Sequence, residues 1–472
     1  MTPSGSGSLR WRVRTASPAV RAVCLALLAI LVASAARNIK EEGDFRGYLE
    51  VGELVLQGRD IYAEARPDVN TWPPFYALVC VPFALLARPS VYLARGVWLL
   101  LNAGLLYAVV RIGVALVYRR PVTLGDRPGG ISVASLAVLG PLLLTSRFFL
   151  GTLDRLQINL LILTCCLAGC LWLVRGKAAW GGGIIGLGAA IKVLPVFFLP
   201  YFLWKRWWRA LAAAAVVGGA CTVSPALVFG PQRWWSYLLR WLEIASGGWP
   251  VRKGNQSVYA MVDRLYTHGA VFWSPAHTRL AASNDPIVSG IVYGLLAVVA
   301  LLLIRAARQG GDDPASPAVT TELAIILAVT VLFSPLAWKH YFVFLWLGHL
   351  VLWRAAVGSG AAIPDRPGGA AAAGRAAGVA AEVREVDADE EAWRLPEHAR
   401  RRLRWVLVLS FALTTLTVRG IVGKAASRTF ETMSTTTLGA LVVLAGLLAV
   451  RALLGAREAE LSARCGSRPH GS

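Results

Sequence analysis

The stretch PIVSGIVYGLLAVVALLLIR, residues 286–305, carries a single charged side chain, at its last position. An α-helix needs about 20 predominantly apolar residues to cross the hydrocarbon core of a bilayer. Backbone N–H and C=O groups in lipid must be satisfied within their own segment, so such a run predicts a helix. Similar runs recur along the chain, at residues 17–36, 73–88, 91–117, 131–147, 156–174, 181–203, 207–229, 318–337, 340–357, 402–420 and 435–456.

The composition agrees with this pattern. The 472-residue chain is 56% hydrophobic and 16% charged, with a mean hydropathy of +0.56. We therefore expect an all-α fold, a polytopic transmembrane helical bundle with about 10–12 membrane segments. The expected parts are a basic cytoplasmic N-terminus, the main transmembrane domain, a low-complexity cytoplasmic linker, C-terminal transmembrane helices and a cytoplasmic tail, at residues 1–16, 17–357, 358–401, 402–456 and 457–472.

The net charge of +21 comes from basic residues in short loops between the apolar runs, for example at 119–120, 205–206, 305–308 and 400–404. This distribution is a signal of membrane topology, and we expect no nucleic-acid partner. All cysteines except Cys465 lie in apolar segments. This placement predicts that the cysteines are small core residues and form neither a metal site nor a disulfide framework.

Charge also predicts which loops face outward. The first apolar run follows a group of arginines, which places the N-terminus in the cytoplasm and the loop after residue 36 outside: Arg10, Arg12, Arg14 and Arg21. If every run crosses, the basic loops at 119–127 and 175–177 fall outside, against the rule. If the proline-containing runs 73–88 and 181–203 dip in and return, both loops move inside. We favour this second arrangement.

The first external loop is unusually acidic for a basic protein. It holds eight carboxylates, at positions 41, 42, 44, 50, 53, 60, 64 and 68. Asp44 lies a few residues beyond the first helix, near the level where a lipid-borne substrate presents its head group. A carboxylate held there could take a proton from an acceptor hydroxyl, so Asp44 is the candidate catalytic base. Tyr48 and Tyr62 are candidates for contacts to sugar or acceptor, and both could also be ordinary interfacial aromatic residues.

Three polar residues stand inside apolar runs. Lys192 is the only charge in its run, and an intramembrane lysine is by default a functional residue. It is a candidate for a substrate phosphate, although it could also extend its amine toward the interface. Gln157 and Asn159 would face the bundle or a cavity and bind sugar or acceptor, or they could join neighbouring helices.

Two later external segments add further candidates. Asn255 and Gln256, followed by Arg264, offer the amide and guanidinium groups that sugar hydroxyls bind, and aromatic residues precede them. Lys339 and His340 place two potential cations at an external helix end. Charge-assisted hydrogen bonds from such groups would stabilise a departing lipid phosphate, whereas Lys339 could equally be an interfacial anchor.

The order of these motifs resembles one family. The motifs are Gly43-Asp-Phe with Tyr48, Gly58-Arg-Asp-Ile-Tyr62, Trp72-Pro-Pro-Phe75, Gln157-Ile-Asn159, Ile191-Lys-Val-Leu-Pro195, Asn255-Gln-Ser257 with Arg264, and Ser334 through Tyr341. Over about residues 17–357 the chain looks like the integral-membrane glycosyltransferases of family 87. These GT-C-fold enzymes include polyprenol-phosphate-mannose-dependent mannosyltransferases that act on phosphatidylinositol mannosides. The chain departs from the expected pattern at Leu156, where a glycine commonly precedes the glutamine.

The resemblance implies Asp44 as the base and a polyprenyl-phosphate sugar as the donor. The expected reaction moves a hexose, mannose first, to a lipid-linked or glycan acceptor with inversion, at the external face of the cell membrane. No metal or other cofactor is expected, and the partners are donor, acceptor and membrane lipids. The alternative is a transporter or flippase of a lipid-linked or anionic solute, using the same broken helices and Lys192. No repeat symmetry is visible in the sequence to support that alternative.

Overall fold

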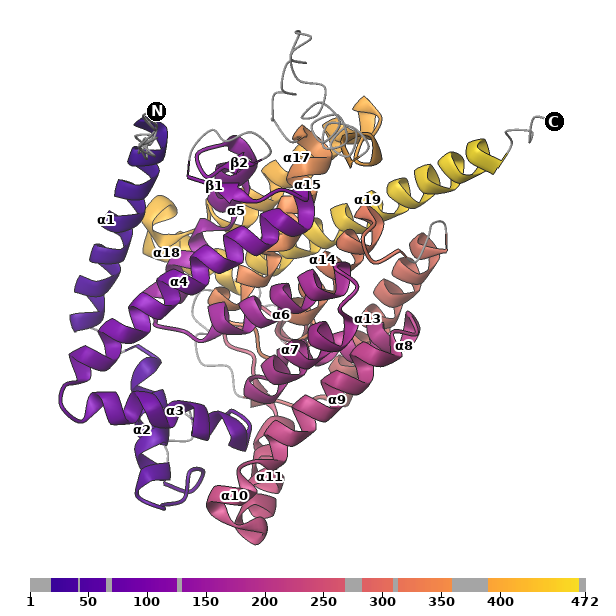
Figure 1. Ribbon diagram of the computed structural model, residues 1–472. Coiled ribbons are helices and arrows are strands. Elements are labelled where there is room, and N and C mark those ends of the chain that lie inside the picture. The colour runs from indigo at the N-terminus through magenta and orange to yellow at the C-terminus, as the bar shows by residue number, and fades with distance from the viewer. Residues whose placement is uncertain are drawn as a thin grey trace, which may run out of the picture.

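The computed structural model describes residues 18–40, 43–64, 70–124, 130–267, 282–308, 313–358 and 389–466. The predicted basic N-terminus, 1–16, and most of the predicted linker lie outside these residues. The described chain is almost entirely helical (Figure 1). Its only sheets are two short strand pairs, β1 (Val122–Thr123) with β2 (Ile131–Ser132), and β3 (Trp249–Pro250) with β4 (Ala282–Ser283).

Most helices follow the predicted apolar runs, with breaks in several runs. In chain order the helices are α1 (Pro18–Lys40), α2 (Phe45–Leu56), α3 (Pro74–Ala87), α4 (Val91–Tyr118), α5 (Leu136–Asp154), α6 (Asn159–Val174), α7 (Ala178–Ile191), η1 (Leu194–Phe197), α8 (Phe198–Trp204), α9 (Trp208–Val223), α10 (Ala226–Phe229), α11 (Pro231–Ser246), α12 (Val258–Thr267), α13 (Pro286–Ala307), α14 (Pro317–Leu332), η3 (Lys339–Leu345), α15 (Trp346–Val357), α17 (Glu397–Thr414), α18 (Arg419–Thr432) and α19 (Thr435–Gly466). Of these, α2, α11, α12 and most of α18 lie between the runs.

The length and apolar composition of several helices are those of membrane-spanning segments. Within the described residues, 7 helices are long and apolar enough to cross a bilayer, or 8 if α17 and α18, bent by 77°, form one span. The 7 candidates are Pro18–Arg37, Val91–Tyr118, Leu136–Asp154, Trp208–Phe229, Pro286–Ala307, Lys339–Val357 and Thr435–Glu460. The predicted all-α, multi-pass membrane class is confirmed.

The run 73–88 forms α3 and does not continue across the molecule. Figure 1 shows α2 and α3 together at the lower end, whereas the start of α1 and the strands β1 and β2 lie at the upper end. The two helices are closely packed, because a Cβ atom at Gly52 would lie 2.7 Å from the Cys80 carbonyl oxygen. The end of α4 and the strand β1 that follows it therefore lie at the same end as the start of α1, as the arrangement with a returning 73–88 segment requires.

The run 181–203 is broken at Lys192. α7 ends at Ile191, Lys192 is extended (φ −150°, ψ 119°), and the chain resumes as the 3-10 helix η1. Glycines let α7 approach α9 closely, since a Cβ atom at Gly182 would collide with the Ala210 carbonyl oxygen. Small residues commonly allow this kind of contact between membrane helices. The break thus puts a lysine at a bend that neighbouring helices hold in place.

The core is formed by α14, η3 and α15: residues 318–332 and nearly all of 342–352 are buried. The fully buried Glu322 of α14 forms a cluster of charged and polar side chains in this core. Its carboxylate accepts hydrogen bonds from Arg451 Nε (2.7 Å) and the Tyr201 hydroxyl (2.8 Å), and Lys205 Nζ lies 3.1 Å away. Buried charges are tolerated when they are paired and hydrogen-bonded in this way. The cluster ties α8, α14 and α19 together.

Candidate active site

The turn that carries Asp44 packs on the turn after α5. Gly43 has a positive φ of 58°, and a Cβ atom there would lie 3.0 Å from the Arg155 carbonyl oxygen. Glycine adopts this backbone conformation without steric cost and leaves room for the carbonyl. Leu156 also has a positive φ of 50°, and its carbonyl accepts a hydrogen bond from Trp98 Nε1 (2.7 Å). The turn at Gly43 therefore packs directly on the turn at 155–156, and Trp98 anchors the second turn to α4.

Asp44 is held by an amide on one side and remains accessible on the other. The Gln157 side-chain amide donates a hydrogen bond to its Oδ2 atom, and the Tyr48 hydroxyl donates to Gln157 Oε1 (3.2 Å). Arg155 Nη1 lies 3.9 Å from Asp44 Oδ1. The Asp44 side chain is 43% exposed and does not cap α2, although the residue precedes that helix. The carboxylate is therefore oriented but still able to meet a substrate.

The surroundings of Asp44 alter its pKa. Partial burial raises the pKa of the carboxyl above its usual value, while the positive charges of Arg155 and Lys192 act in the opposite direction. Desolvation disfavours the charged form of a carboxyl group, and nearby cations favour it. A carboxylate with a raised pKa is a stronger proton acceptor, provided that the pH stays above that pKa.

Lys192 directs its amine toward the same region. Its Nζ atom donates to Asn159 Oδ1 (2.8 Å) and lies 3.6 Å from the centre of the Tyr341 ring. Asn159 Nδ2 in turn donates to the main-chain oxygen of His340 (3.2 Å). The side chain of Lys192 is thus bonded inside the bundle between α6 and η3, with little exposure.

Lys339 and His340 lie at the start of η3, beside this group. Lys339 forms an ion pair with Glu431 of α18. The His340 Nε2 atom is buried and has no hydrogen-bond partner among the described residues, while the His340 carbonyl also accepts from Thr152 Oγ1 (3.1 Å). An unpartnered buried nitrogen is uncommon in a folded protein and marks a position that a ligand or water could occupy.

Sequence reasoning missed Arg155. It follows α5 directly, is 59% exposed, and its charge reaches Asp44, Lys339 and His340. A basic residue at a helix end is usually a topology signal, so nothing in its own position marks it. Its proximity in sequence to Gln157 was the available clue. We hereafter call Asp44, Arg155, Gln157, Asn159, Lys192 and His340 the Asp44 cluster.

Three predicted sugar-binding residues lie elsewhere: Asn255 and Gln256 in the loop before α12, and Arg264 within α12. Asn255 Nδ2 donates to the carbonyls of Pro250 and Pro335 (both 2.9 Å). The Gln256 amide nitrogen donates to the carbonyls of Lys253 and Glu431 (both 2.7 Å). In all of these contacts a side-chain amide donates to a main-chain carbonyl, and both side chains are inaccessible. The role that the structure gives them is to fix the loop to the turn at 334–338, and their sugar contacts stay a prediction.

Arg264 also donates hydrogen bonds to main-chain carbonyls of this loop. Its Nη1 atom donates to the carbonyls of Val251 (2.8 Å) and Asn255 (3.0 Å), and its Nη2 atom donates to Ser434 Oγ (2.6 Å). Burial lowers the pKa of the guanidinium to about 10, which leaves it charged at neutral pH. Arg264 therefore joins the 251–255 loop to the start of α19.

Replacing Arg264 with Leu is expected to lower the melting temperature of the protein in detergent by several degrees. Hydrogen bonds to a charged group each contribute about 1.5–3 kcal/mol, and the abandoned carbonyls would remain buried. The control is Arg252→Met, because Arg252 is exposed and its guanidinium lies over the Trp338 ring. An Arg264→Leu variant with an unchanged melting curve and weakened substrate binding would favour a direct binding role instead.

The two predicted tyrosines separate in space. Tyr48 is buried in an aromatic group with Trp72 and Tyr76, and it belongs to the Asp44 neighbourhood through Gln157. Tyr62 donates to the Trp72 carbonyl (2.6 Å) and packs edge-on against Tyr237, in a second apolar cluster. Tyr62 thus supports the loop through Trp72, whose ring packs on Tyr48, and its contact to sugar or acceptor stays a prediction.

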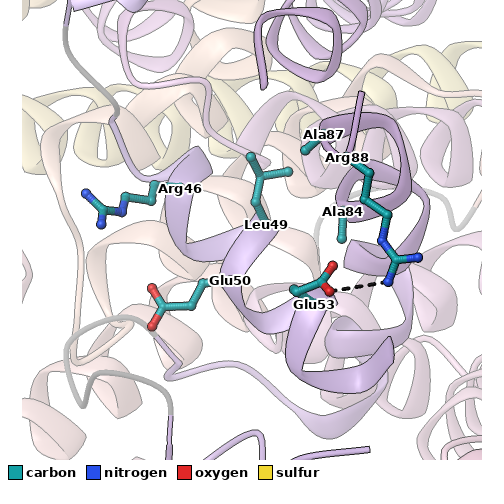
Figure 2. Close-up of a pocket in the computed structure, with 7 residues that line it drawn as sticks. All are labelled: Arg46, Leu49, Glu50, Glu53, Ala84, Ala87 and Arg88. Atoms are coloured by element: carbon teal, nitrogen blue, oxygen red, sulfur yellow. Dashed lines mark hydrogen bonds and ion pairs between the residues drawn. The ribbon is translucent and has the colours of Figure 1, made fainter. Parts of the chain in front are cut away.

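A hollow between α2 and the end of α3 begins two residues from Asp44, at Arg46. Figure 2 shows its lining, which comes from α2 and the end of α3: Arg46, Leu49, Glu50, Glu53, Ala84, Ala87 and Arg88. Arg88 and Glu53 form an ion pair across it (3.3 Å). Asp44 is not among the lining residues. In the part of the chain that the structure describes, no three His, Cys, Asp or Glu side chains come together to hold a metal ion.

The fold and the site together define a multi-pass helical membrane protein with a carboxylate beside several cations at one end of the bundle. Residues 70–335 match the family model of glycosyltransferase family 87. The chain belongs to this family, and the resemblance found in the sequence is confirmed. The matched segment includes Gln157, Asn159 and Lys192, while Asp44, Lys339 and His340 lie just outside it.

Curated relatives agree with the family. The chain is 29% identical over 299 residues to the polyprenol-phosphate-mannose-dependent alpha-(1-2)-phosphatidylinositol pentamannoside mannosyltransferase of Mycolicibacterium smegmatis, covering 62% of this chain and 63% of that protein. It is 26% identical over 298 residues to the protein of the same description from Mycobacterium tuberculosis, covering 62% and 60%. The chain thus spans about three fifths of the length of these relatives.

Two solved structures also align with the chain. They are ArnT from Cupriavidus metallidurans in the apo state, with a TM-score of 0.36, and the same protein bound to undecaprenyl phosphate, with a TM-score of 0.39. Both are 16% identical to this chain. The first alignment covers 92% of this chain and 78% of ArnT, and the second covers 94% and 79%.

Proposed function

We propose that this protein is a membrane glycosyltransferase that moves a hexose, mannose in the first instance, from a polyprenyl-phosphate sugar to a lipid-linked or glycan acceptor. The family supports the class of activity, and the descriptions of the relatives support the donor and the sugar. The observation that carries the proposal is the Asp44 carboxylate, oriented by Gln157, half exposed, and flanked by Arg155 and Lys192.

In the proposed reaction Asp44 acts as a general base. An acceptor hydroxyl oxygen attacks the anomeric carbon of the donor sugar, the bond from that carbon to the phosphate oxygen breaks, and the hydroxyl proton passes to Asp44 Oδ1. The bonding electrons leave with the lipid phosphate. A single displacement inverts the anomeric configuration, so a β-linked donor would give an α-glycoside. General-base assistance of this kind contributes about 10²–10⁴ in rate.

The departing phosphate carries negative charge, and the site supplies cations to meet it. Lys192 and Arg155 both lie close enough to Asp44 to act on its carboxyl electrostatically, and Lys339 adjoins them. Charge-assisted hydrogen bonds from such groups to phosphate oxygens strengthen as charge develops. The buried His340 imidazole beside these cations can offer a neutral hydrogen bond from its unpartnered Nε2 atom. We assign Lys192 and Arg155 as the principal phosphate contacts. Lys339 is a secondary one, because Glu431 already neutralises part of its charge.

We further propose that the Asp44 cluster faces the outside of the cell membrane. The arginines before α1 favour a cytoplasmic N-terminus. Asp44 follows α1 directly, and Figure 1 shows α2 and α3 at the end of the molecule opposite the start of α1. Single cysteines at positions 45, 256 and 338 should therefore react with a membrane-impermeant maleimide applied from outside once the protein is unfolded in place, and position 380 should not.

Arg155→Gln is expected to move the acidic limb of the pH–rate profile to higher pH. Only ionised Asp44 can accept a proton, so the rate falls as the pH drops through its raised pKa. The charge of Arg155 lowers that pKa, and removing the charge lets the pKa rise further. Arg175→Gln is the matched control, because Arg175 is exposed at the opposite end of α6. An acidic limb that stays in place in Arg155→Gln would contradict the assignment of Asp44 as the titrating base.

The test of the function is transfer itself. Purified protein in detergent is incubated with radiolabelled polyprenyl-phosphate-mannose and a membrane lipid extract, and the lipids are separated. We expect label to appear in an acceptor lipid, dependent on the polyprenyl-phosphate donor and unaffected by a metal chelator. Label that remains on the donor, while the protein moves donor between leaflets of a vesicle, would favour the flippase alternative.

A further inference from the structure

The surface of helix α11 has three faces: one that packs on the protein, one exposed and apolar, and one exposed and polar. Its core-facing side consists of Tyr237 and the partly buried Trp234, Trp241 and Ile244. The remaining, exposed half of the helix is split in two. One stripe is apolar, and the other is polar. A helix that met only water on its outer half would be expected to be polar across that whole half.

The core face joins α11 to the first loop. The Tyr237 ring packs edge-on against Tyr62 with a centroid distance of 5.7 Å. Trp241 Nε1 donates to the Thr71 carbonyl (3.3 Å), and Arg233 Nη1 donates to the Gly58 carbonyl (3.0 Å). The segments that surround Tyr62 are therefore bound to α11 at three points, so the position of α11 sets the position of this loop.

The apolar stripe is large for an exposed surface. Trp235, Leu239 and Leu242 are 53%, 44% and 47% exposed and follow the i, i+4, i+7 spacing of one helix face. Beside them the polar stripe runs along the helix at the same spacing, through Gln232, Ser236, Arg240 and Glu243, with an ion pair between the last two (2.8 Å). The border between the stripes runs parallel to the helix axis.

The chain reaches α11 directly from a candidate membrane span. The segment Trp208–Phe229 has the length and hydropathy to cross a bilayer, and Leu227 and Val228 at its end are 91% and 58% exposed. Gly230, with a φ of 79°, turns the chain, and Pro231 begins α11. Figure 1 shows α10 and α11 at the lower end of the molecule, where α9 ends. The apolar stripe therefore follows, along the chain, the exposed apolar end of a candidate membrane span.

We propose that α11 is an interfacial helix that lies along the membrane surface, with Trp235, Leu239 and Leu242 in the lipid. Gln232, Ser236, Arg240 and Glu243 face the water. Helices of this type bury their apolar side about 5–10 Å into the boundary between head groups and acyl chains, and tryptophan is favoured at that level. The occupant of the apolar stripe is phospholipid. Through Tyr237, Trp241 and Arg233 the helix holds the first loop at the head-group level.

The test places nitroxide labels on single cysteines at positions 235, 239 and 242, and at the matched positions 232, 236 and 243. The full-length protein is reconstituted in vesicles of phosphatidylcholine and phosphatidylglycerol, and the unsubstituted protein, labelled in parallel, gives the contribution of its native cysteines. Collision with lipid-soluble oxygen and with a water-soluble nickel chelate is measured. The first set should meet oxygen several-fold more than chelate, and the second set should show the reverse. Melting curves in detergent confirm that each variant is folded.

Two results would overturn the proposal. Equal chelate access at 236 and 239 would show that water covers both stripes. Dipolar broadening at 239 that disappears on dilution with unlabelled protein would show that a second copy of the chain covers the apolar stripe. The readout does not depend on catalysis, so it stands or falls separately from the proposed transfer reaction.

Discussion

Asp44→Asn is expected to lower the rate of sugar transfer by about 10²–10⁴, because the amide cannot accept the acceptor proton. Asparagine has nearly the same shape, and its side-chain oxygen can still accept the hydrogen bond from the Gln157 amide. Folding should therefore be retained, and the melting temperature in detergent should stay close to that of the native protein. The measurement is turnover with saturating donor and acceptor.

The control for this variant is Asp60→Asn, in the same segment between α1 and α3. Asp60 caps a turn by accepting from the main-chain nitrogens of Tyr62 (2.8 Å) and Ala63 (2.9 Å), and it makes no contact with the Asp44 cluster in the described structure. Its loss should affect stability more than turnover. An Asp44→Asn enzyme that kept half of the native rate would exclude Asp44 as the base.

Lys192→Met is expected to raise the donor concentration needed for half-maximal rate by at least tenfold while leaving the protein folded. The replacement keeps the length of the apolar stem and removes a costly charge from the membrane region. It also removes a charge-assisted contact to the donor phosphate. The measurement pairs a donor titration with a melting curve on the same preparation.

Two interpretations of Lys192 give opposite results. If the amine only joins α7 to Asn159, the Met variant changes stability and leaves donor dependence unchanged. That outcome would remove Lys192 from the phosphate site and leave Arg155, Lys339 and His340. A Lys192→Arg variant distinguishes charge from geometry, because it keeps a cation but not the compact ammonium that lies over the Tyr341 ring.

Much of the fold could be predicted from the sequence, because bilayer length and backbone hydrogen bonding leave few choices for long apolar runs. The break at Lys192 could also be predicted, since Pro195 and Pro200 interrupt the run in which it stands. The number of crossings was harder to obtain. α3 has the apolar composition of a span, but it is 14 residues long, shorter than the about 20 residues that a crossing needs, and it packs closely against α2.

The site was only partly predictable. Asp44 and Gln157 are 113 residues apart in sequence, and their contact depends on the close approach of Gly43 to Arg155, which no periodic pattern reports. Arg155 was missed for the same reason. A different difficulty concerns residues whose type indicated a binding site but whose contacts brace a loop: Asn255, Gln256 and Arg264. Amide and guanidinium groups bind main-chain carbonyls as readily as sugar hydroxyls, so residue type alone could not distinguish a loop brace from a binding site.

The most direct measurement of the central claim compares native protein and Asp44→Asn in one transfer assay, with radiolabelled polyprenyl-phosphate-mannose and a membrane lipid extract. We predict transfer of label to an acceptor lipid by the native protein, an α-linked product from a β-linked donor, and at least a hundredfold loss with Asp44→Asn, the lower end of the range of about 10²–10⁴. Equal transfer by the two proteins, or transfer only from a nucleotide sugar, would contradict the account.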